Sequence, residues 1–206
     1  MSEGLLLGDA PLLLASTSAA RRQLLTAAGI PFEAMASGVN EREVEAPLLA
    51  KGGRPDIVAE HLARAKAHAV ASRAKGRFVL GADQTLDFEG RLVTKPASEA
   101  EARAQLLSFS GKQHRLHSAL CLARHGQILF ETVATSKLVC RAFSAEFIDS
   151  YMRAVGDGVL ASVGAYQIEG LGVHLFEKIE GDHATIMGLP LLPLLAHLRR
   201  EGLIVA

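Results

Sequence analysis

The chain has 206 residues, of which 49% are hydrophobic and 21% are charged, which suits one globular domain with a full core. Its 22 basic and 22 acidic side chains cancel, and this balance argues against a general nucleic-acid binder or a membrane-surface binder. Glu3 and Asp9 do not suit a signal peptide. The two cysteines, Cys121 and Cys140, lie in apolar surroundings typical of core residues in a reducing compartment. We therefore expect a single cytoplasmic domain over residues 1–206.

The first predicted element is a strand at residues 12–14, where three leucines suit a strand that is buried on both faces. An amphipathic helix follows at residues 23–28, with Ser18 as its predicted N-cap. Arg21 and Arg22 then lie near the positive end of the helix dipole, where cations are unfavourable unless an anion binds the free N–H groups. Two interpretations remain open at this point: a phosphate-binding turn, and an ordinary turn with solvated arginines.

The next stretch separates two parts of the predicted sheet. Residues 32–47 are acidic and lack a regular pattern, so we expect an irregular segment. A long helix should begin at Asp56, its predicted N-cap, and end at Gly76. Lys66 lies on the border of the apolar stripe of this helix. A short buried strand is predicted at residues 77–83.

This buried strand ends in Asp83, and a predicted hairpin that turns at Glu89 and Gly90 brings Lys95 back alongside it. A two-residue loop would pair Gln84 with Lys95. A three-residue loop would place Asp83 opposite Lys95, and we favour this register because glycine suits a bulged turn. The outcome is a carboxylate beside an ammonium, which suits either a functional site or a simple cross-strand ion pair.

The remaining predicted elements are a helix with a capping box, a β-hairpin, a second capped helix and a terminal helix, at residues 98–111, 114–140, 144–155 and 188–203. Strand–helix units mixed with hairpins predict an α/β fold with one mixed sheet flanked by helices. Two interpretations of the apolar terminal segment remain: a helix docked on the core, and the surface of a homodimer.

Two histidines, His114 and His117, form an H-x-x-H pattern that is found in zinc sites. Residues three apart on a strand point to opposite faces, so the pair is poorly placed to share a metal. We predict a structural role for it, with His114 hydrogen-bonded near the preceding turn, and we treat His183 as a loop residue.

A triphosphate site requires several cations together with carboxylates that hold a divalent metal. The chain offers four candidate cations and two candidate carboxylates: Arg21, Arg22, Lys66, Lys95, Glu41 and Asp83. Two hard oxygen ligands, completed by substrate phosphates and water, are typical of Mg²⁺.

Four stretches resemble the Maf family, in the family's order, between residues 12 and 198. LLLASTSAARRQLLTAAGIPFE resembles its Leu-Ala-Ser-x-Ser-Pro-Arg-Arg opening, and VLGADQTLDFEGRLVTKP resembles its central Ala-Asp…Gly…Lys-Pro motif. FSGKQHRLHSAL resembles its Leu-Ser-Gly-x-x-His stretch, and GAYQIEGLGVHLFEKIEGDHATIMGLPL resembles its Gly-x-Tyr…Gly-Leu-Pro-Leu block. On this combination of motifs the chain is identified as a member of the Maf family.

The resemblance implies a nucleoside triphosphate pyrophosphatase that splits NTP into NMP and pyrophosphate with Mg²⁺ or Mn²⁺ and so removes modified or non-standard nucleotides. It implies an inosine-triphosphate-pyrophosphatase-like fold with two lobes around a cleft. Asp83 would be the proton acceptor and a metal ligand, and Glu41 would be a metal ligand or a carboxylate that positions the water. The side chains expected to bind the phosphates, from the resemblance and from the chemistry of the helix start, are Ser16, Ser18, Arg21, Arg22, Lys66 and Lys95.

Two alternatives to a pyrophosphatase remain. Maf proteins are also linked to septum formation, so the chain would in one alternative be a nucleotide-binding regulator of cell division that needs no turnover. The other alternative is a phosphatase that releases orthophosphate. A water-activating carboxylate such as Asp83 favours an enzyme, because a pure binder has little use for it.

The chain departs from the usual family pattern at three places. Ala20 stands where proline usually precedes the double arginine, a change that softens the turn without removing chemistry. Gln84 follows Asp83 where many members have threonine, and Glu169 replaces a glutamine. This pair resembles the branch of the family that acts on 7-methyl-GTP, so Gln84 and Glu169 are the expected base-selecting residues. A carboxylate suits a cationic methylated guanine, although Glu169 would equally suit a salt bridge at a strand end.

Overall fold

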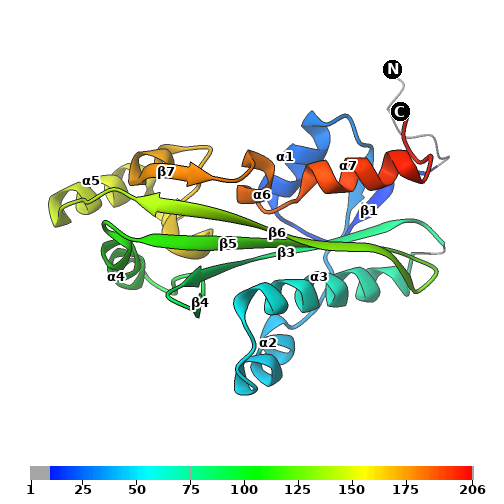
Figure 1. Cartoon of the computed structure of the whole chain (residues 1–206), viewed down its shortest axis with the longest axis horizontal. Coiled ribbons are helices and arrows are strands. Elements are labelled where there is room, and N and C mark those ends of the chain that lie inside the picture. Colours follow the sequence, from blue (N-terminus) through cyan, green and yellow to red (C-terminus); the bar gives the residue numbers. More distant parts are fainter. Residues whose placement is uncertain (1–9, 75, 206) are drawn as a thin grey trace.

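The computed structural model describes residues 10–74 and 76–205, and in these residues it contains one seven-stranded sheet (Figure 1). The strands are β1 (Leu12–Leu14), β2 (Phe32–Ala34), β3 (Val79–Phe88), β4 (Arg91–Val93), β5 (Gln113–Arg124), β6 (Gln127–Cys140) and β7 (Phe176–Glu180). Their order is β2-β1-β3-β5-β6-β7, and β4 pairs with β3. Because β1 is parallel to β2 and β3 while the other pairs are antiparallel, the predicted mixed α/β sheet is confirmed.

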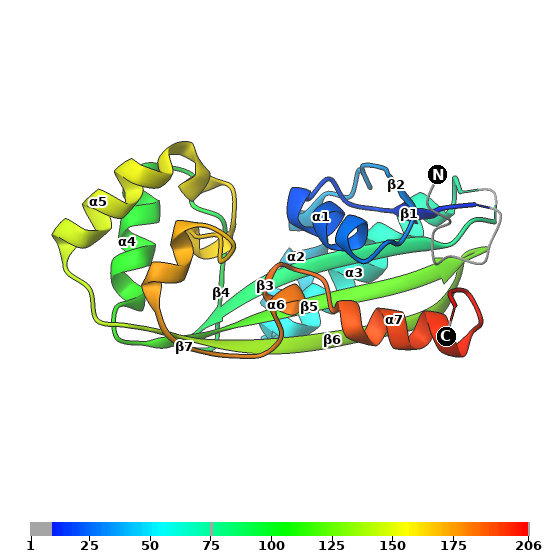
Figure 2. The same ribbon diagram turned by 90° about the horizontal axis from the view of Figure 1, so that it is seen from above.

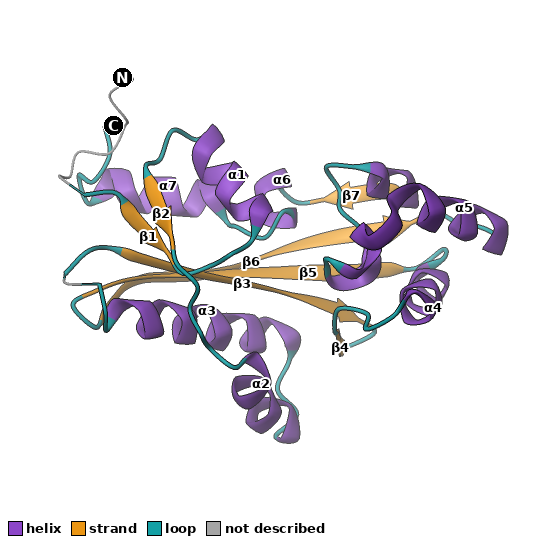
Figure 3. Ribbon diagram, turned by 180° about the vertical axis from the view of Figure 1, so that it is seen from behind, coloured by secondary structure: helices purple, strands orange, loops and turns teal. Residues whose placement is uncertain are grey.

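Helices cover both faces of this sheet. They are α1 (Ala19–Ala27), α2 (Glu41–Ala50), α3 (Pro55–Ala71), α4 (Glu99–Phe109), α5 (Ala145–Val155), α6 (His183–Ile186) and α7 (Leu191–Arg200), with short 3₁₀ turns at Gly156–Leu160, Val163–Ala165 and Leu171–Leu175. Figures 1 and 3 show α3 on one face and α1 and α7 on the other, and Figure 2 shows α4 and α5 at the far end of the long strands. Across the described part of the chain, no helix has the length and apolarity that a membrane crossing requires.

The short strand β1 shows how the two faces are filled. Leu13 packs with alanines of α3 on one face. Leu12 and Leu14 pack on the other face with Leu25 of α1 and Leu194 of α7. Successive side chains of a strand point to opposite faces, so a run of leucines contributes to both cores at once. The predicted strand at residues 12–14 is therefore confirmed, and so is the docking of the terminal helix on the core.

The close approach of α3 to β3 depends on small residues. Gly81 of β3 faces Ala63 and Ala67 of α3, and a Cβ at Gly81 would overlap the backbone of both. Lys66 lies on the same stretch of α3, and Asp83 follows Gly81 by two residues. The glycine thus lets a helix and a strand approach closely enough to place these two charged side chains together.

The prediction of an irregular segment at residues 32–47 is wrong. Phe32–Ala34 is strand β2, which pairs in parallel with β1, and Glu41–Ala50 is helix α2. Pro47 lies inside α2, and a proline at such a position usually ends a helix. Two glutamates in the first turn favour the helix because negative charge there complements the helix dipole.

Helix α3 also differs from its prediction at both ends. Pro55 is the first residue of the helix and Arg54 is its N-cap residue. Asp56, the predicted N-cap, instead lies in the first turn, where its carboxylate accepts hydrogen bonds from Arg54 at 3.0 and 2.6 Å. The helix ends at Ala71 and does not reach Gly76.

The serine caps and the long hairpin are confirmed. Ser18, Ser98 and Ser144 each accept a hydrogen bond from a backbone N–H in the first turn of their helices. Strands β5 and β6 pair through a two-residue turn at His125 and Gly126, which have φ values of 51° and 77°. Positive φ at both positions is typical of a type I′ turn, whose twist matches that of the strands.

Both cysteines are confirmed as core residues. Cys121 and Cys140 lie in the described part of the chain, where they are buried and unpaired. Burial raises the pKa of each thiol to about 12. Because the thiolate is the reactive form, these side chains serve packing and not chemistry.

The two histidines of the H-x-x-H pattern have separate partners. His114 of β5 is 1% exposed and packs against Phe109 of α4, and its Nε2 lies 2.6 Å from the hydroxyl oxygen of Tyr166. His117 Nδ1 lies 2.9 Å from the hydroxyl oxygen of Thr135. His114 therefore bonds a residue distant in the sequence, whereas the predicted bond lay near the preceding turn.

His114 should make folding stability depend on pH. Burial lowers the pKa of His114 to about 4, whereas an unfolded histidine titrates near 6.5. The stability contributed by the neutral ring is complete above pH 6.5 and is lost as the pH falls toward 4. We expect the free energy of unfolding to fall by about 3 kcal/mol over this range. Denaturant titrations at several pH values measure this fall, and the His114→Gln variant should show a correspondingly flatter curve. Equal slopes in the two proteins would contradict the assignment.

Candidate active site

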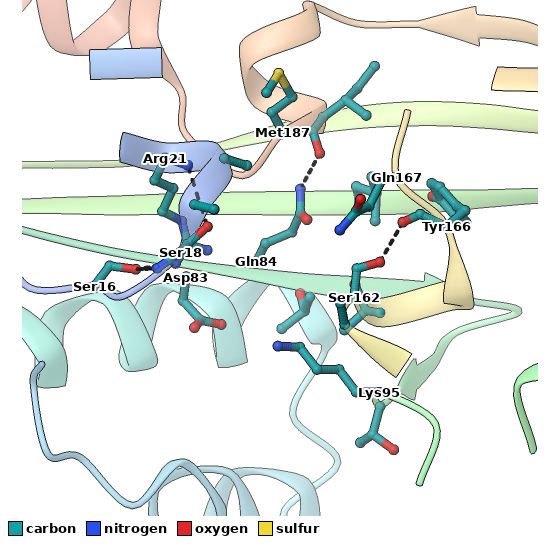
Figure 4. Close-up of a pocket in the computed structure, with 18 of the residues that line it drawn as sticks. Ser16, Ser18, Arg21, Asp83, Gln84, Lys95, Ser162, Tyr166, Gln167 and Met187 are labelled. Carbon is teal, nitrogen blue, oxygen red and sulfur yellow. Dashed lines mark hydrogen bonds between the residues drawn. The ribbon is translucent and has the colours of Figure 1, made fainter. Parts of the chain in front are cut away.

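A pocket of about 820 Å³ lies where α1, α2, α3 and β3 meet the segment between α5 and β7, a volume typical of small-molecule sites (Figure 4). Nine of the residues singled out in the sequence line this pocket: Ser16, Ser18, Arg21, Glu41, Lys66, Asp83, Gln84, Lys95 and Glu169. The structure therefore brings together side chains from segments that are distant in the sequence.

The start of α1 supplies one end of the pocket. Ser16 Oγ accepts hydrogen bonds from the Ser18 backbone N–H at 3.2 Å and from the Arg21 guanidinium at 3.1 Å. Arg21 Nε also donates to the carbonyl oxygen of Gly188 at 2.8 Å. Arg21 is only 8% exposed, so its charge is fixed at this end of the pocket.

Arg22 does not join this group. It is exposed and is not among the residues that line the pocket. Adjacent residues of a helix point about 100° apart, so when Arg21 faces the pocket Arg22 must face away. The structure thus gives no support to Arg22 as a phosphate ligand.

Lys66 joins the two predicted carboxylates. Its ammonium lies 2.5 Å from Asp83 Oδ1 and 2.5 Å from Glu41 Oε1. The Lys66 and Asp83 side chains are each 9% exposed, whereas that of Glu41 is 53% exposed. The pocket therefore contains a buried ion pair with a second, more accessible carboxylate at its edge.

The pKa values of the two carboxylates shift in opposite directions. Burial raises the pKa of Asp83, although the positive charges of Lys66 and Arg21 oppose this shift. Burial also acts to raise the pKa of Glu41, but the hydrogen bond and charge of Lys66, with Lys95 and Arg21, outweigh it and the pKa is lowered. Asp83 is therefore the stronger base of the two.

The hairpin register differs from the favoured prediction. β3 and β4 pair Leu86 with Val93 and Phe88 with Arg91, which leaves a two-residue loop of Glu89 and Gly90. β4 ends before Lys95, and the cation beside Asp83 is Lys66. Lys95 still lines the pocket, and Figure 4 shows its ammonium directed toward the side that holds Asp83.

Helix α2 contributes two pocket residues that sequence reasoning missed. Arg42 and Glu45 line the pocket together with Glu41. Burial, together with the charges of Glu41 and Asp83, raises the pKa of Glu45. Glu41 and Glu45 are four residues apart and so share one face of a helix. The sequence shows this spacing, but it places two residues on one face only in a helix, and the segment was predicted to be irregular.

Gln84 lies in the middle of the pocket, between Ser16 and Arg21 on one side and Gln167 and Tyr166 on the other (Figure 4). Its amide nitrogen Nε2 lies 2.9 Å from Ser118 Oγ, 3.1 Å from the carbonyl oxygen of Thr185 and 2.9 Å from that of Ile186. These contacts hold the amide between β5 and α6. Gln84 is therefore fixed in the wall of the pocket.

The segment from Ser162 to Glu169 forms the wall opposite α1. Ser162, Tyr166 and Gln167 line the pocket, and Ser162 donates a hydrogen bond to the carbonyl oxygen of Tyr166 at 2.5 Å. Glu169 is exposed at the end of this wall and lies between two 3₁₀ turns, not at a strand end. His183 begins α6 and is not among the lining residues.

Glu41 and Asp83 are the carboxylates best placed to hold a divalent metal. Lys66 uses one oxygen of each, and the second oxygens Oε2 and Oδ2 remain available. Among the described residues no group of three or more histidine, cysteine, aspartate or glutamate side chains is arranged to hold a metal. Two carboxylates fit Mg²⁺ or Mn²⁺, which complete their shell with substrate oxygens and water, better than zinc.

Proteins of several bacteria resemble this chain over nearly its whole length. A nucleoside triphosphate pyrophosphatase of Nitrobacter winogradskyi is 50% identical over 198 residues, which cover 96% of each chain. A 7-methyl-GTP pyrophosphatase of Brucella suis is 50% identical over 190 residues, 92% of this chain and 96% of its own, and one of Rhizobium johnstonii is 49% identical over 193 residues, 94% and 97%.

The chain also resembles one solved structure and the sequence pattern of a protein family. The Staphylococcus aureus Ham1 protein aligns with 64% of this chain and 71% of its own, at 11% identity and a TM-score of 0.38. The sequence pattern of the Maf-like proteins matches residues 11–201. With this match and relatives at about half identity over nearly their full lengths, the motif resemblance is confirmed: the chain belongs to the Maf-like protein family.

Proposed function

We propose that this chain is a nucleoside triphosphate pyrophosphatase, which hydrolyses the bond between the α and β phosphates and releases NMP and pyrophosphate. The relative from Nitrobacter winogradskyi carries the name of that activity. The observation that supports it most is the convergence of three cations around one buried aspartate. Arg21, Lys66 and Lys95 come from α1, α3 and the segment after β4, and all three line the pocket that contains Asp83.

The cations would bind the triphosphate. Arg21 presents a guanidinium whose plane is fixed by Ser16 and Gly188, a geometry suited to phosphate oxygens. Ser16 and Ser18 add hydroxyls at the start of α1, where free N–H groups favour an anion. Lys66 and Lys95 would offset the charge that develops on the leaving pyrophosphate.

Asp83 would act as the proton acceptor. Its carboxylate takes a proton from a water molecule as the water oxygen bonds to the α-phosphorus, and the bond from that phosphorus to the bridging oxygen breaks. The leaving pyrophosphate keeps the electron pair of the broken bond. Because burial raises the pKa of Asp83, its carboxylate is a better base than an exposed aspartate.

Glu41 and Asp83 would hold a divalent metal through the carboxylate oxygens that Lys66 does not use. When bound, Mg²⁺ or Mn²⁺ neutralises phosphate charge and orients the substrate. Each carboxylate oxygen has more than one lone pair, so Asp83 retains acceptor capacity beside a metal.

The nucleobase would be selected in the part of the pocket lined by Gln84 and Glu169. Relatives named 7-methyl-GTP pyrophosphatase and nucleoside triphosphate pyrophosphatase are about equally similar to this chain, so overall identity does not distinguish them. Gln84 offers an amide oxygen to N–H donors on a guanine edge, and Glu169 offers a negative charge to a cationic 7-methylguanine. We therefore propose 7-methyl-GTP as a substrate and Gln84 and Glu169 as the base-selecting residues.

Product analysis with a panel of nucleotides tests this function. The chain is incubated with Mg²⁺ or Mn²⁺ and 7-methyl-GTP, GTP, dTTP, UTP or CTP, and the released phosphates are separated. Pyrophosphate with NMP is the expected outcome, and the Glu169→Gln variant should lower the preference for 7-methyl-GTP. Release of orthophosphate would indicate a phosphatase instead. Binding without turnover of any nucleotide would favour the alternative, a nucleotide-binding regulator.

The two neighbouring arginines should differ sharply in this assay. Arg21→Ala removes a buried guanidinium from the phosphate end of the pocket, and we expect KM to rise about tenfold or more. Arg22→Ala is the matched control, because Arg22 is exposed and outside the pocket, and its KM should stay within about twofold of wild type. Equal effects of the two substitutions would show that Arg21 is not a phosphate ligand.

A further inference from the structure

A short segment, Asp182 to Gly188, contacts two of the pocket residues, Arg21 and Gln84, through its backbone. The carbonyl oxygen of Gly188 accepts a hydrogen bond from Arg21 Nε at 2.8 Å. The carbonyl oxygens of two residues further back in this segment lie 3.1 and 2.9 Å from the amide nitrogen of Gln84. Figure 4 shows Met187 of this segment above Gln84, with Arg21 to the left on α1. One segment therefore contacts both a residue proposed to bind phosphate and a residue proposed to select the base.

The segment is itself fixed by residues that do not line the pocket. The Asp182 carboxylate caps α6 by accepting hydrogen bonds from the Ala184 N–H at 2.9 Å and from the N–H and hydroxyl of Thr185. Ser118 Oγ donates to the carbonyl oxygen of Thr185 at 2.6 Å. Ser118 is fully buried and Thr185 is 2% exposed, so neither can contact a substrate directly.

These bonds decide which atom of Gln84 faces the substrate. A carbonyl oxygen only accepts hydrogen bonds, so two carbonyls beside the amide require its NH₂ group to face them. Turning the amide over would set its oxygen against both carbonyl oxygens, an arrangement of acceptor against acceptor that is unfavourable. The amide oxygen of Gln84 is therefore left as the acceptor available in the pocket. An acceptor suits a base edge that carries N–H donors, such as the N1–H and N2–H₂ of guanine.

We propose that the Asp182–Gly188 segment is a positioning element that sets the orientation of both Arg21 and Gln84, with Ser118 and Asp182 as positioning residues for base selection and phosphate binding. The inference rests on the proposed function, because it assigns these two residues to a nucleotide. Ser118 bonds Gln84 directly and the Thr185 carbonyl that Gln84 also contacts, so we expect its effect mainly on Gln84, whereas Asp182 holds the start of the turn and should affect both residues.

The first test separates Ser118 from a general packing role. The ratio of kcat/KM between the preferred nucleotide and the others is measured for Ser118→Ala, with Ser136→Ala as the matched control. Ser136 is equally buried on the neighbouring strand β6, and within the described chain its hydroxyl has no hydrogen-bond partner. We expect Ser118→Ala to lower this ratio about threefold to tenfold and Ser136→Ala to leave it unchanged.

Two further measurements make the test specific. Adding Ser118→Ala to Gln84→Ala should lower the preference no further than Gln84→Ala alone, because the serine acts through the glutamine. Tripolyphosphate has no nucleobase, so its inhibition constant Ki measures binding by the phosphate-binding residues alone. Its Ki should be unchanged in Ser118→Ala and weakened about threefold to tenfold in Asp182→Ala.

The outcomes distinguish this inference from the proposed function. If the wild-type chain hydrolyses none of the nucleotides, the proposed function fails, and the same comparisons are then made with dissociation constants from calorimetry. If Ser118→Ala behaves as Ser136→Ala does, or if its effect adds fully to that of Gln84→Ala, the positioning role is wrong although the enzyme activity stands. An unchanged Ki for tripolyphosphate in Asp182→Ala would show that the segment does not set the orientation of Arg21.

Discussion

Replacing Asp83 with asparagine is expected to lower kcat for nucleotide hydrolysis by about 10²–10⁴-fold, the usual contribution of a positioned general base. The amide keeps the shape of the carboxylate but does not accept a proton from water. Nucleotide binding should persist or tighten, because the change removes a negative charge beside Arg21 and Lys66. Single-turnover kinetics measure the first effect, and calorimetric titration with a nucleotide measures the second.

Asp87→Asn is the matched control for this experiment. Asp87 is also a buried aspartate on β3, but its carboxylate accepts a hydrogen bond from the Gly90 N–H at 2.8 Å and lies near Arg115 and His117, outside the pocket. Loss of the Asp87 carboxylate should weaken the hairpin and leave kcat unchanged. If Asp83→Asn turned over as fast as Asp87→Asn, the proton acceptor would have to be a different group.

The parts of the site that are local in sequence were predictable. Ser18 and Arg21 belong to a strand–turn–helix unit of a few residues, in which cap chemistry and helical spacing place each side chain. Arg22 was not separated from Arg21 in the same way. The structure separates the two because Arg21 lies four residues before the buried Leu25 and shares its face of the helix, whereas Arg22 does not.

The partner of Asp83 depends on distant contacts and was predicted wrongly. The sequence favoured Lys95, because Gly90 suits a bulged turn with a three-residue loop. The structure instead has a two-residue loop with Glu89 at φ 53°, a conformation that is uncommon for a residue other than glycine. Lys66 reaches Asp83 because α3 packs closely on β3, a tertiary contact that no local pattern reveals.

Two other contributions to the pocket were hidden for different reasons. Pro47 concealed helix α2, and with it the pocket positions of Arg42 and Glu45. The carbonyl groups that hold Arg21 and Gln84 belong to the backbone, which every residue has. Their positions depend on the path of the chain and not on the identity of a side chain, so a sequence pattern does not disclose them.

Replacing Lys66 with methionine should have the second large effect, because one ammonium holds two carboxylates together. Methionine retains the apolar stem but leaves Asp83 buried beside Glu41 without its nearest cation. We expect the free energy of unfolding to fall by about 3 kcal/mol, as measured by denaturant titration. Lys95→Met is the matched control: Lys95 is exposed, so its loss should weaken substrate binding and leave the midpoint of unfolding unchanged.

The same variant should shift the pH dependence of turnover. Asp83 must be deprotonated to accept a proton, so kcat/KM falls as the pH drops below its pKa. Burial raises that pKa and Lys66 opposes the rise, so removing Lys66 should move the acid limb of the profile to higher pH. Adding Asp83→Asn to Lys66→Met should restore much of the lost stability, because one of the two carboxylates then carries no charge. An acid limb that stays in place, with a wild-type unfolding midpoint, would mean that Lys66 does not control the charge of Asp83.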